Sequence, residues 1–557
     1  MKQKIAATEH VSAEWSYQSQ KKYSDPFNDL ELDVVISNGD GGRWTVPAYW
    51  AGGQEWRVRF AAPDPGVYRF HSVCSDSGNE ELHGQEGELT VSPYQGENPL
   101  LRHGHIQVSE NRRRFRHADG TPFFWLGDTW WYGLCSRLRW PKDFKYLVAN
   151  RKELGFSLFQ IFVSFPPDSR DFDPRGSNQA GLAWEQGYSR INPKYFDAVD
   201  LRIQHLVESG IVPCIYGCQG YYYVWMGEQV LKKHWRYLIG RYGAYPVLWC
   251  LAGETTSPYY LLDGTEEWDR NKVIQKKGWT EIARYVRSED PYRHPVTSHP
   301  YPFIDGRDDV EEEGVLDFNL LQCGHGGYEN LPKMADFVVK AYKRTPVMPV
   351  VNGESNYEGM FGRNWEDIQR FHFWTSMLSG VAGYTYGADG IMQMNDKEQL
   401  FGPSPFGIAW GNTTWQDASR FAGCRQIAKG KQLLERYPWW EFEPHQEWVK
   451  RYPAHNEFTR PYCAGIPNRV RILYYPEPIM RHSTPITVQR LEAGSRYKAF
   501  YFDPRSGEEY HLEKVDPEQN GGWTASYPPI AQDWVLVLEN LSRRRSSDAP
   551  EKEDNIV

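Results

Sequence analysis

Two glutamates follow short apolar segments of this chain, and their type and placement could do chemistry. The run Val347–Val351 leads through Asn352 and Gly353 into Glu354, and the run Val247–Leu251 leads through Ala252 and Gly253 into Glu254. A short, continuously apolar segment is typical of a strand buried on both faces of a parallel sheet. Two carboxyl groups delivered by such strands to one face of a barrel could cleave a glycosidic bond, one as acid and the other as nucleophile or base.

The elements that would position these glutamates lie between residues 100 and 440. Apolar strand-like runs alternate there with helical stretches, which is the pattern of βα units around a parallel sheet. The pattern predicts an α/β fold, a (β/α)8 TIM barrel, with Glu254 after the fourth strand and Glu354 after the seventh. The eight candidate strands are Phe123–Leu126, Leu158–Val163, Ile211–Tyr216, Val247–Leu251, Pro295–Thr297, Phe318–Leu321, Val347–Val351 and Gly383–Tyr386.

The segments on either side of the predicted barrel have a different pattern of residue types. Residues 1–95 contain short alternating strands separated by turn residues such as Pro63-Asp64-Pro65-Gly66, and residues 441–542 return to this pattern. Both segments are therefore predicted to be β-sandwiches. Residues 543–557 are polar and charged, and we expect them to be disordered.

Polar and aromatic side chains near the ends of the other strands suggest a sugar-binding bowl. Asp128 has two interpretations, as an acceptor from a sugar hydroxyl or as a cap on the next helix. Glu358 could support Glu354 or compete with it as nucleophile. The substrate-binding candidates are Asp128, Trp130, Trp131, Gln219, Tyr222, His299, Gln322, Tyr357 and Tyr386.

Composition narrows the class of protein. The chain has 557 residues, a formal net charge of −9 and no basic stripe, which argues against nucleic-acid binding. No apolar run approaches the roughly 20 residues needed to span a bilayer. Aromatic residues make up 15% of the chain, and an aromatic ring can pack against the apolar face of a sugar.

Three motifs carry a resemblance to a known family. The segments Phe124–Trp131, Glu354–Gly359 and Gly383–Gly390 resemble the apiosidase-like family of barrel glycoside hydrolases, and the first sandwich resembles the small β domain that often precedes such catalytic domains. The resemblance implies a (β/α)8 hydrolase without metal or organic cofactor, with Glu354 as nucleophile. Related barrels often carry Asn immediately before the strand-4 acid, whereas this chain has Gly253.

The leading hypothesis is a retaining, exo-acting glycosidase that cleaves oligosaccharides with Glu254 and Glu354. The alternatives are an endo-acting cellulase-like or mannanase-like barrel and a catalytically silent carbohydrate-binding protein. Either glutamate could instead form a structural ion pair at the barrel mouth. We expect a cytoplasmic protein, because no apolar signal segment is seen at the N-terminus and the cysteines are scattered. The edges of the sandwiches could pair two copies of the chain.

Overall fold

The structure, a computed structural model, describes residues 3–452, 459–476 and 486–543. The predicted disordered tail lies outside the described residues, apart from Arg543. The chain divides into two compact units. The first comprises Met1–Gly326, Arg344–Asn364 and Ala382–Phe421, and the second comprises Gly327–Lys343, Trp365–Val381 and Ala422–Val557.

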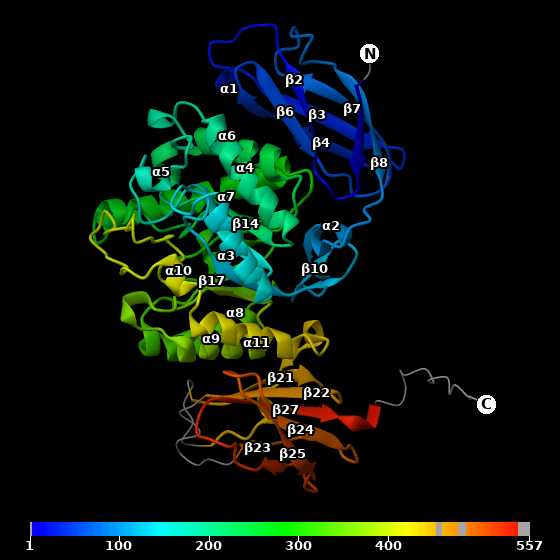
Figure 1. The fold of residues 1–557 in the computed structure, drawn as a ribbon, viewed down its shortest axis with the longest axis vertical. Coiled ribbons are helices and arrows are strands. Elements are labelled where there is room, and N and C mark those ends of the chain that lie inside the picture. Colours follow the sequence, from blue (N-terminus) through cyan, green and yellow to red (C-terminus); the bar gives the residue numbers. More distant parts are fainter. Residues whose placement is uncertain (1–2, 453–458, 477–485, 544–557) are drawn as a thin grey trace, which may run out of the picture. The chain divides into compact units, whose positions relative to one another are not determined.

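The first unit begins with two antiparallel-rich sheets that pack as a sandwich (Figure 1). Inward and outward side chains alternate along β7, as expected for a strand with one solvated face. Trp15 of β2 contacts Phe70 of β7 with ring centroids 4.9 Å apart, which joins the two sheets. One sheet has the order β1 (Gln3–Thr8), β8 (Glu86–Ser92), β7 (Gly66–Cys74), β3 (Leu32–Asn38), β4 (Arg43–Pro47), and the other β2 (Ala13–Gln18), β6 (Glu55–Phe60), β5 (Tyr49–Gly52).

Short elements connect the sandwich to the barrel. A small sheet is formed by β9 (Ile106–Val108), β10 (Phe115–His117) and β11 (Pro122–Phe123). The short helices α1 (Pro26–Asp29) and α2 (Pro99–Arg102) each begin with proline, whose fixed φ suits the first helical turn. Asp25 and Asn98 cap these helices through their side-chain oxygens.

Eight parallel strands form the predicted barrel. Their order is β16 (Val296–Thr297), β15 (Leu248–Cys250), β14 (Val212–Cys218), β13 (Leu158–Phe165), β12 (Trp125–Thr129), β19 (Gly383–Tyr386), β18 (Val350–Glu354), β17 (Asn319–Gln322). The end strands are linked by bonds from Asp317 N–H to the Val296 carbonyl at 2.8 Å and from Thr297 Oγ1 to the Phe318 carbonyl at 2.7 Å. The fold-class prediction is confirmed, because the eight strands form a nearly closed parallel barrel, preceded in the sequence by N-terminal sheets and followed by C-terminal sheets.

Two predicted strands are displaced. The seventh was expected at Val347–Val351 and forms at Val350–Glu354, so Glu354 is its last residue. The first strand was expected at Phe123–Leu126, but Phe123 belongs to β11 and the barrel strand is Trp125–Thr129. The polar residue Asp128 is tolerated inside this fully buried strand because the guanidinium of Arg151 pairs with its carboxylate at 2.7 Å. The apolar pattern alone therefore placed the first strand too early.

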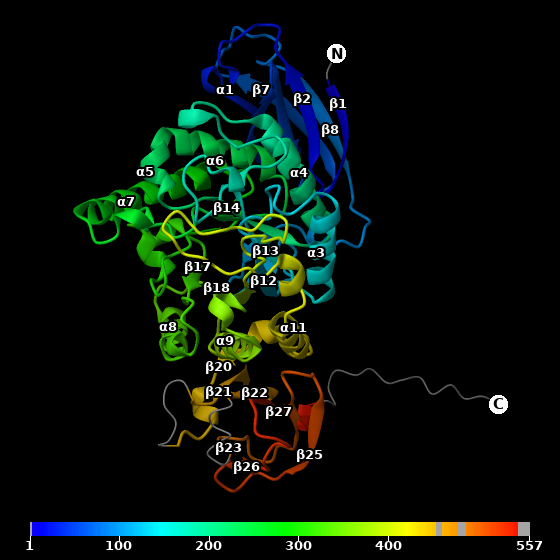
Figure 2. The ribbon, with the colours of Figure 1, turned by 60° about the vertical axis from the view of Figure 1, so that its left-hand side comes forward.

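Helices cover the outside of the barrel strands in the first unit (Figure 2). In α4, Pro193 begins the helix, and buried residues such as Phe196, Val199 and Ile203 recur at helical spacing. Thr265 caps α7 by accepting a hydrogen bond from the Trp268 N–H at 3.2 Å. Besides α1 and α2, the helices of this unit are α3 (Lys142–Glu153), α4 (Pro193–Glu208), α5 (Tyr222–Met226), α6 (Glu228–Tyr242), α7 (Glu266–Glu289) and α10 (Trp415–Ala418).

The second unit combines three helices with the C-terminal sheets. Its core includes Leu473, Leu536, Val488 and Trp523, drawn from both sheets of the predicted sandwich. The helices are α8 (Leu331–Lys343), α9 (Glu366–Leu378) and α11 (Ala422–Leu434). One sheet has the order β20 (Glu443–Pro444), β21 (Tyr462–Ile466), β22 (Val470–Tyr475), β27 (Trp534–Asn540), β24 (Tyr497–Phe502), β25 (Glu509–Val515), and β23 (Ile486–Val488) pairs with β26 (Trp523–Ala525).

Two further observations concern the whole described chain. Within the described ranges, none of the helices is both long enough and apolar enough to cross a bilayer. All eight cysteines fall among the described residues, and they are buried with free thiols.

Candidate active site

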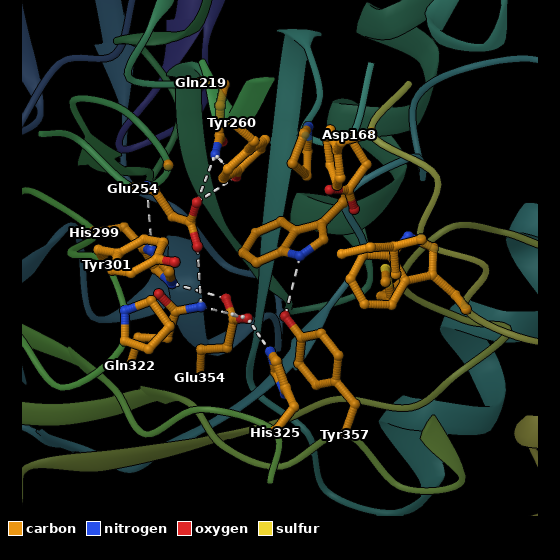
Figure 3. Close-up of a pocket in the computed structure, with 18 of the residues that line it drawn as sticks. Asp168, Gln219, Glu254, Tyr260, His299, Tyr301, Gln322, His325, Glu354 and Tyr357 are labelled. Atoms are coloured by element: carbon orange, nitrogen blue, oxygen red, sulfur yellow. Dashed lines mark hydrogen bonds and ion pairs between the residues drawn. The ribbon is translucent and has the colours of Figure 1, made fainter. Parts of the chain in front are cut away.

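A pocket of about 370 Å³ opens at the carboxyl ends of the barrel strands (Figure 3). Residues within or after every one of the eight strands line it. Glu354 is the last residue of β18, and Glu254 follows β15. The two predicted catalytic glutamates thus meet in one cavity, whose size lies at the lower end of the range usual for small-ligand sites.

Glu354 is surrounded by hydrogen-bond donors. His325 Nε2 lies 2.9 Å from Oε1, Gln322 Nε2 donates to the same oxygen at 3.0 Å, and His299 Nε2 lies 2.9 Å from Oε2. Burial by itself would raise the pKa of the Glu354 carboxyl, but the hydrogen bonds and charges of His299 and His325 outweigh it and lower that pKa. Glu354 is therefore held as a carboxylate.

His299 links the two glutamates. The backbone N–H of Glu254 points at His299 Nδ1, 3.5 Å away, so Nδ1 serves as the acceptor. In a neutral imidazole the proton is then on Nε2, the nitrogen that faces Glu354. The backbone of one glutamate thereby favours the histidine tautomer that supports the other.

The surroundings of Glu254 shift the pKa of its carboxyl group in the opposite direction from that of Glu354. Its side chain is partly open to the pocket. Tyr260 Oη donates a short hydrogen bond to Oε2, and Gln219 Nε2 approaches the same oxygen at 3.4 Å. Burial raises the pKa of the Glu254 carboxyl, and the nearby charge of Glu354 adds to this effect. Glu254 thus keeps its proton to higher pH than an ordinary glutamate.

Gln322 fixes the separation of the two carboxyl groups. Its Nε2 donates to Glu254 Oε1 at 3.3 Å and to Glu354 Oε1 at 3.0 Å. The two oxygens can be no more than about 6.3 Å apart, which is the sum of these bonds. The two N–H bonds of a primary amide diverge by about 120°, and hydrogen bonds of these lengths along them correspond to a separation of about 5.5 Å.

The backbone of Glu254 is held in an unusual conformation. Its φ is 42°, in the left-handed region that non-glycine residues seldom adopt. Hydrogen bonds on either side maintain it: Gly253 N–H donates to the Cys218 carbonyl at 2.9 Å, and Thr255 N–H donates to the His299 carbonyl at 2.8 Å. Such strain is found where surrounding structure over-determines a functional residue.

Aromatic side chains form much of the pocket wall. Trp131 Nε1 donates to Tyr357 Oη at 3.0 Å, which fixes both rings beside Glu354. Tyr260, after the fourth strand, packs edge-on against Phe406, after the eighth strand, with ring centroids 4.6 Å apart. Because the fourth and eighth strands lie on opposite sides of an eight-stranded barrel, this contact spans the mouth of the pocket.

Seven of the eleven predicted site residues line the pocket. Each of them lies within or just after a strand end, as the sequence pattern indicated. They are Trp131, Gln219, Glu254, His299, Gln322, Glu354 and Tyr357.

Four predicted substrate-binding residues do not line the pocket, because each is paired with, stacked on or hydrogen-bonded to another side chain. Asp128 is fully buried against Arg151, and it neither faces the cavity nor caps the next helix. Trp130 stacks on Phe159 and donates to Asp128. Tyr222 stacks on Phe165. Tyr386 donates to Glu358 at 2.6 Å, which places Glu358 in packing outside the pocket as well.

Several pocket residues lie on loops that the sequence reasoning did not select. Asp168 follows β13, Tyr260 lies in a short 3-10 turn after β15, and Trp410 lies in the long segment between β19 and α10. Burial raises the pKa of Asp168 to about 8, the charges of Glu254 and Glu354 act in the same direction, and Arg175 opposes them. The Pro166-Pro167 pair before Asp168 is the signal that could have drawn attention to this loop.

In the part of the chain that the structure describes, no group of three or more His, Cys, Asp or Glu side chains is arranged to hold a metal ion.

Comparisons with known proteins agree with this architecture. Residues 109–441 match the family described as apiosidase-like, catalytic domain, and residues 8–75 match a domain of unknown function, DUF5060. No curated protein matches the chain.

Solved structures share the fold. One, named a glycoside hydrolase, has a TM-score of 0.66 at 22% identity and covers 81% of this chain and 99% of its own. A glycoside hydrolase family 5 protein from Bacteroides vulgatus has a TM-score of 0.66 at 23% identity and covers 81% of this chain and 96% of its own. Another Bacteroides vulgatus structure reaches a TM-score of 0.69 at 16% identity, covering 97% of this chain and all of its own.

The family match covers more than half of the chain and spans the barrel that holds the pocket. The predicted resemblance is confirmed: the chain belongs to the apiosidase-like family and is a glycoside hydrolase.

Proposed function

We propose that this enzyme is a retaining glycosidase in which Glu354 is the nucleophile and Glu254 is the acid and base. The observation that carries the proposal is the pair of carboxyl groups held by one amide, that of Gln322, with their pKa values shifted in opposite directions. Such divergence is how one site keeps an acid and a nucleophile at the same pH.

The separation of the carboxyl groups supports the retaining mechanism. The value of about 5.5 Å derived from the Gln322 bonds matches the 5–5.5 Å usual for retaining enzymes, and even the upper bound falls short of the 6.5–9.5 Å that leaves room for a water in inverting enzymes.

The reaction would run in two steps. Glu354 attacks the anomeric carbon and the bond to the leaving oxygen breaks, while Glu254 gives its proton to that oxygen, leaving a glycosyl ester on Glu354. Glu254, now a carboxylate, removes a proton from water as the water attacks the same carbon. The ester bond breaks, Glu354 leaves as a carboxylate, and both glutamates return to their starting protonation states.

The shape of the pocket supports exo action on oligosaccharides. An endo-acting enzyme needs a cleft that continues past the catalytic pair on both sides, whereas the contact between Tyr260 and Phe406 crosses the mouth. The loop side chains that line the pocket include Tyr260, Phe406 and Trp410, whereas residues 169–184 contribute none.

The test is hydrolysis of a panel of aryl pyranosides and furanosides by the wild type and by Glu354→Gln. We expect a hit that Glu354→Gln loses by at least about 10⁴-fold in kcat, because the amide cannot form the glycosyl ester. The anomer formed first, followed by proton NMR, should have the configuration of the substrate. A first product of inverted configuration would refute the retaining mechanism, and a hit that survives in Glu354→Gln would refute the nucleophile.

A further inference from the structure

Asp168 is a third carboxyl group in the pocket and has no role in the two-step reaction. It follows β13, lies among the lining residues, and is partly open to the cavity (Figure 3). Glu254 and Glu354 each accept hydrogen bonds from neighbouring side chains. Among the residues that the structure describes, none donates a hydrogen bond to the Asp168 carboxyl group.

The backbone around Asp168 is clamped at three successive carbonyl groups. Tyr132 Oη donates to the Pro167 carbonyl, Arg175 Nη2 donates to the Asp168 carbonyl at 3.2 Å, and Tyr221 Oη donates to the Ser169 carbonyl at 3.1 Å. These bonds hold Asp168 at a φ of 59°, in the left-handed region. A strained, rigid backbone that presents an unpartnered carboxyl group to a pocket is typical of a pre-organised ligand contact.

The charge of the pocket limits what that ligand can be. Four lining residues carry carboxyl groups, Asp168, Glu254, Asp263 and Glu354, and the lining includes no lysine or arginine. The lining histidines, His299 and His325, both face Glu354. A uronic acid or sulfated sugar would therefore bring an anion to a site without a free cation, whereas a neutral sugar brings hydroxyl groups.

We propose that Asp168 is a substrate-binding residue that holds a hydroxyl group of an uncharged sugar in the pocket and thereby sets the sugar specificity. This inference rests on the proposed function, and it identifies the contact by which the enzyme selects the sugar that it releases. A carboxyl group that keeps its proton at neutral pH can donate to the hydroxyl oxygen and accept from its proton. The raised pKa of Asp168 is consistent with this use.

The first test combines variants of Asp168 with monodeoxy versions of the sugar that the aryl glycoside panel identifies. Asp168→Ala should lower kcat/KM about 10- to 100-fold, and Asp168→Asn, which can still donate and accept, should stay within about fivefold of the wild type. One monodeoxy substrate should lose activity with the wild type but lose nothing further with Asp168→Ala, because the two changes remove the same contact. The control is Asp171→Ala, which changes an exposed carboxylate of the same loop.

The second arm compares matched neutral and anionic substrates, such as an aryl glucoside with the glucuronide and an aryl galactoside with the galacturonide. Neutral members should be preferred at least about 100-fold. If only the uronides were hydrolysed, the proposal that the substrate sugar is uncharged would be refuted. If every monodeoxy substrate lost as much activity with Asp168→Ala as with the wild type, the proposed contact between Asp168 and a sugar hydroxyl would be refuted.

A third readout needs no substrate. The folded-state pKa of Asp168, about 8, lies above the unfolded value near 3.8, so its effect on stability is absent at low pH and grows as pH rises between these values. Asp168→Asn should therefore raise the melting temperature by at least about 2 °C at pH 8 and leave it unchanged at pH 4. An unchanged or lower melting temperature at pH 8 would mean that the wild-type carboxyl has a partner, against the inference.

The outcomes separate the inference from the proposed function. Activity that survives in Glu354→Gln refutes the catalytic assignment, whatever Asp168 does. Activity that Glu354→Gln abolishes but that Asp168→Ala leaves unchanged refutes only the role of Asp168.

Discussion

Polar side chains end the barrel strands in two regions, and the two regions differ in what those side chains bind. Around β15, β17 and β18, the carboxyl groups of Glu254 and Glu354 contact histidines, amides and a tyrosine. Around β12 and β19, Asp128 is paired with the fixed cation of Arg151, and Glu358 accepts from Tyr386. Both regions look equally functional in the sequence.

The comparison shows that position at a strand end does not distinguish chemistry from packing, whereas the partner does. Asp128 and Arg151 form an ion pair in which both side chains are fully buried, so the carboxyl group of Asp128 is enclosed by its partner. Imidazole, amide and phenol groups surround Glu254 and Glu354 and shift the pKa of each carboxyl group, and both side chains still line the pocket.

Among the three variants that compare the two regions, Glu254→Gln should have the largest effect on activity. With poor leaving groups, which need a proton, kcat/KM should fall about 10³-fold, and with activated aryl glycosides the first step should change little. Steady-state rates across leaving groups of different acidity check this. Azide, a nucleophile that needs no base, should restore turnover of activated substrates; equal losses across all leaving groups would refute the acid role.

Asp128→Asn should lower the stability of the fold and leave the activity of the folded enzyme nearly unchanged. Removing the charge leaves the Arg151 guanidinium buried without its carboxylate, which should cost about 3–5 kcal/mol of unfolding free energy. Because Asp128 does not line the pocket, kcat/KM per folded molecule should stay within about twofold of the wild type. Urea denaturation and active-site titration measure the two quantities. A variant of normal stability that had lost activity would erase the distinction between the regions.

Tyr260→Phe should have the smallest effect. The ring still packs on Phe406, but the hydroxyl that lowers the pKa of Glu254 is gone. A retaining enzyme needs Glu254 protonated, so kcat/KM falls as pH rises through its pKa, and this alkaline limb should move upward by less than about 1 pH unit. Tyr301→Phe, another lining tyrosine, is the matched control and should leave the limb in place. A downward shift in Tyr260→Phe would contradict the assigned hydrogen bond.

How far the sequence could predict this molecule depends on the range of the interaction involved. All eight barrel strands were predicted because buried parallel strands are continuously apolar, and Glu254 and Glu354 were predicted because they end such runs. The misplaced first strand and the misassigned Asp128 share one cause, since Arg151 lies 23 residues away and no local pattern pairs it with Asp128.

Loop residues were missed for a related reason. Asp168 is separated from the end of β13 by the Pro166-Pro167 pair, and Phe406 lies in the long segment between β19 and α10. Phe406 packs against Tyr260, a residue of a distant loop. Periodicity reports which face of an element is buried, but it does not report where a connecting segment folds back. The meeting of Glu254 and Glu354 in one pocket was therefore predictable, whereas the pocket residues on the loops were not.

The glycine before Glu254 has a consequence for how this site can vary among relatives. A Cβ at Gly253 would lie 2.4 Å from Gln219 Oε1 and 2.6 Å from Phe162 Cζ, so the amide of Gln219 fills the space that a side chain at 253 would need. That amide comes from the neighbouring strand and approaches Glu254 itself. Positions 162, 219 and 253 should therefore covary in evolution: a relative with asparagine at 253 should carry smaller or displaced side chains at 219 and 162.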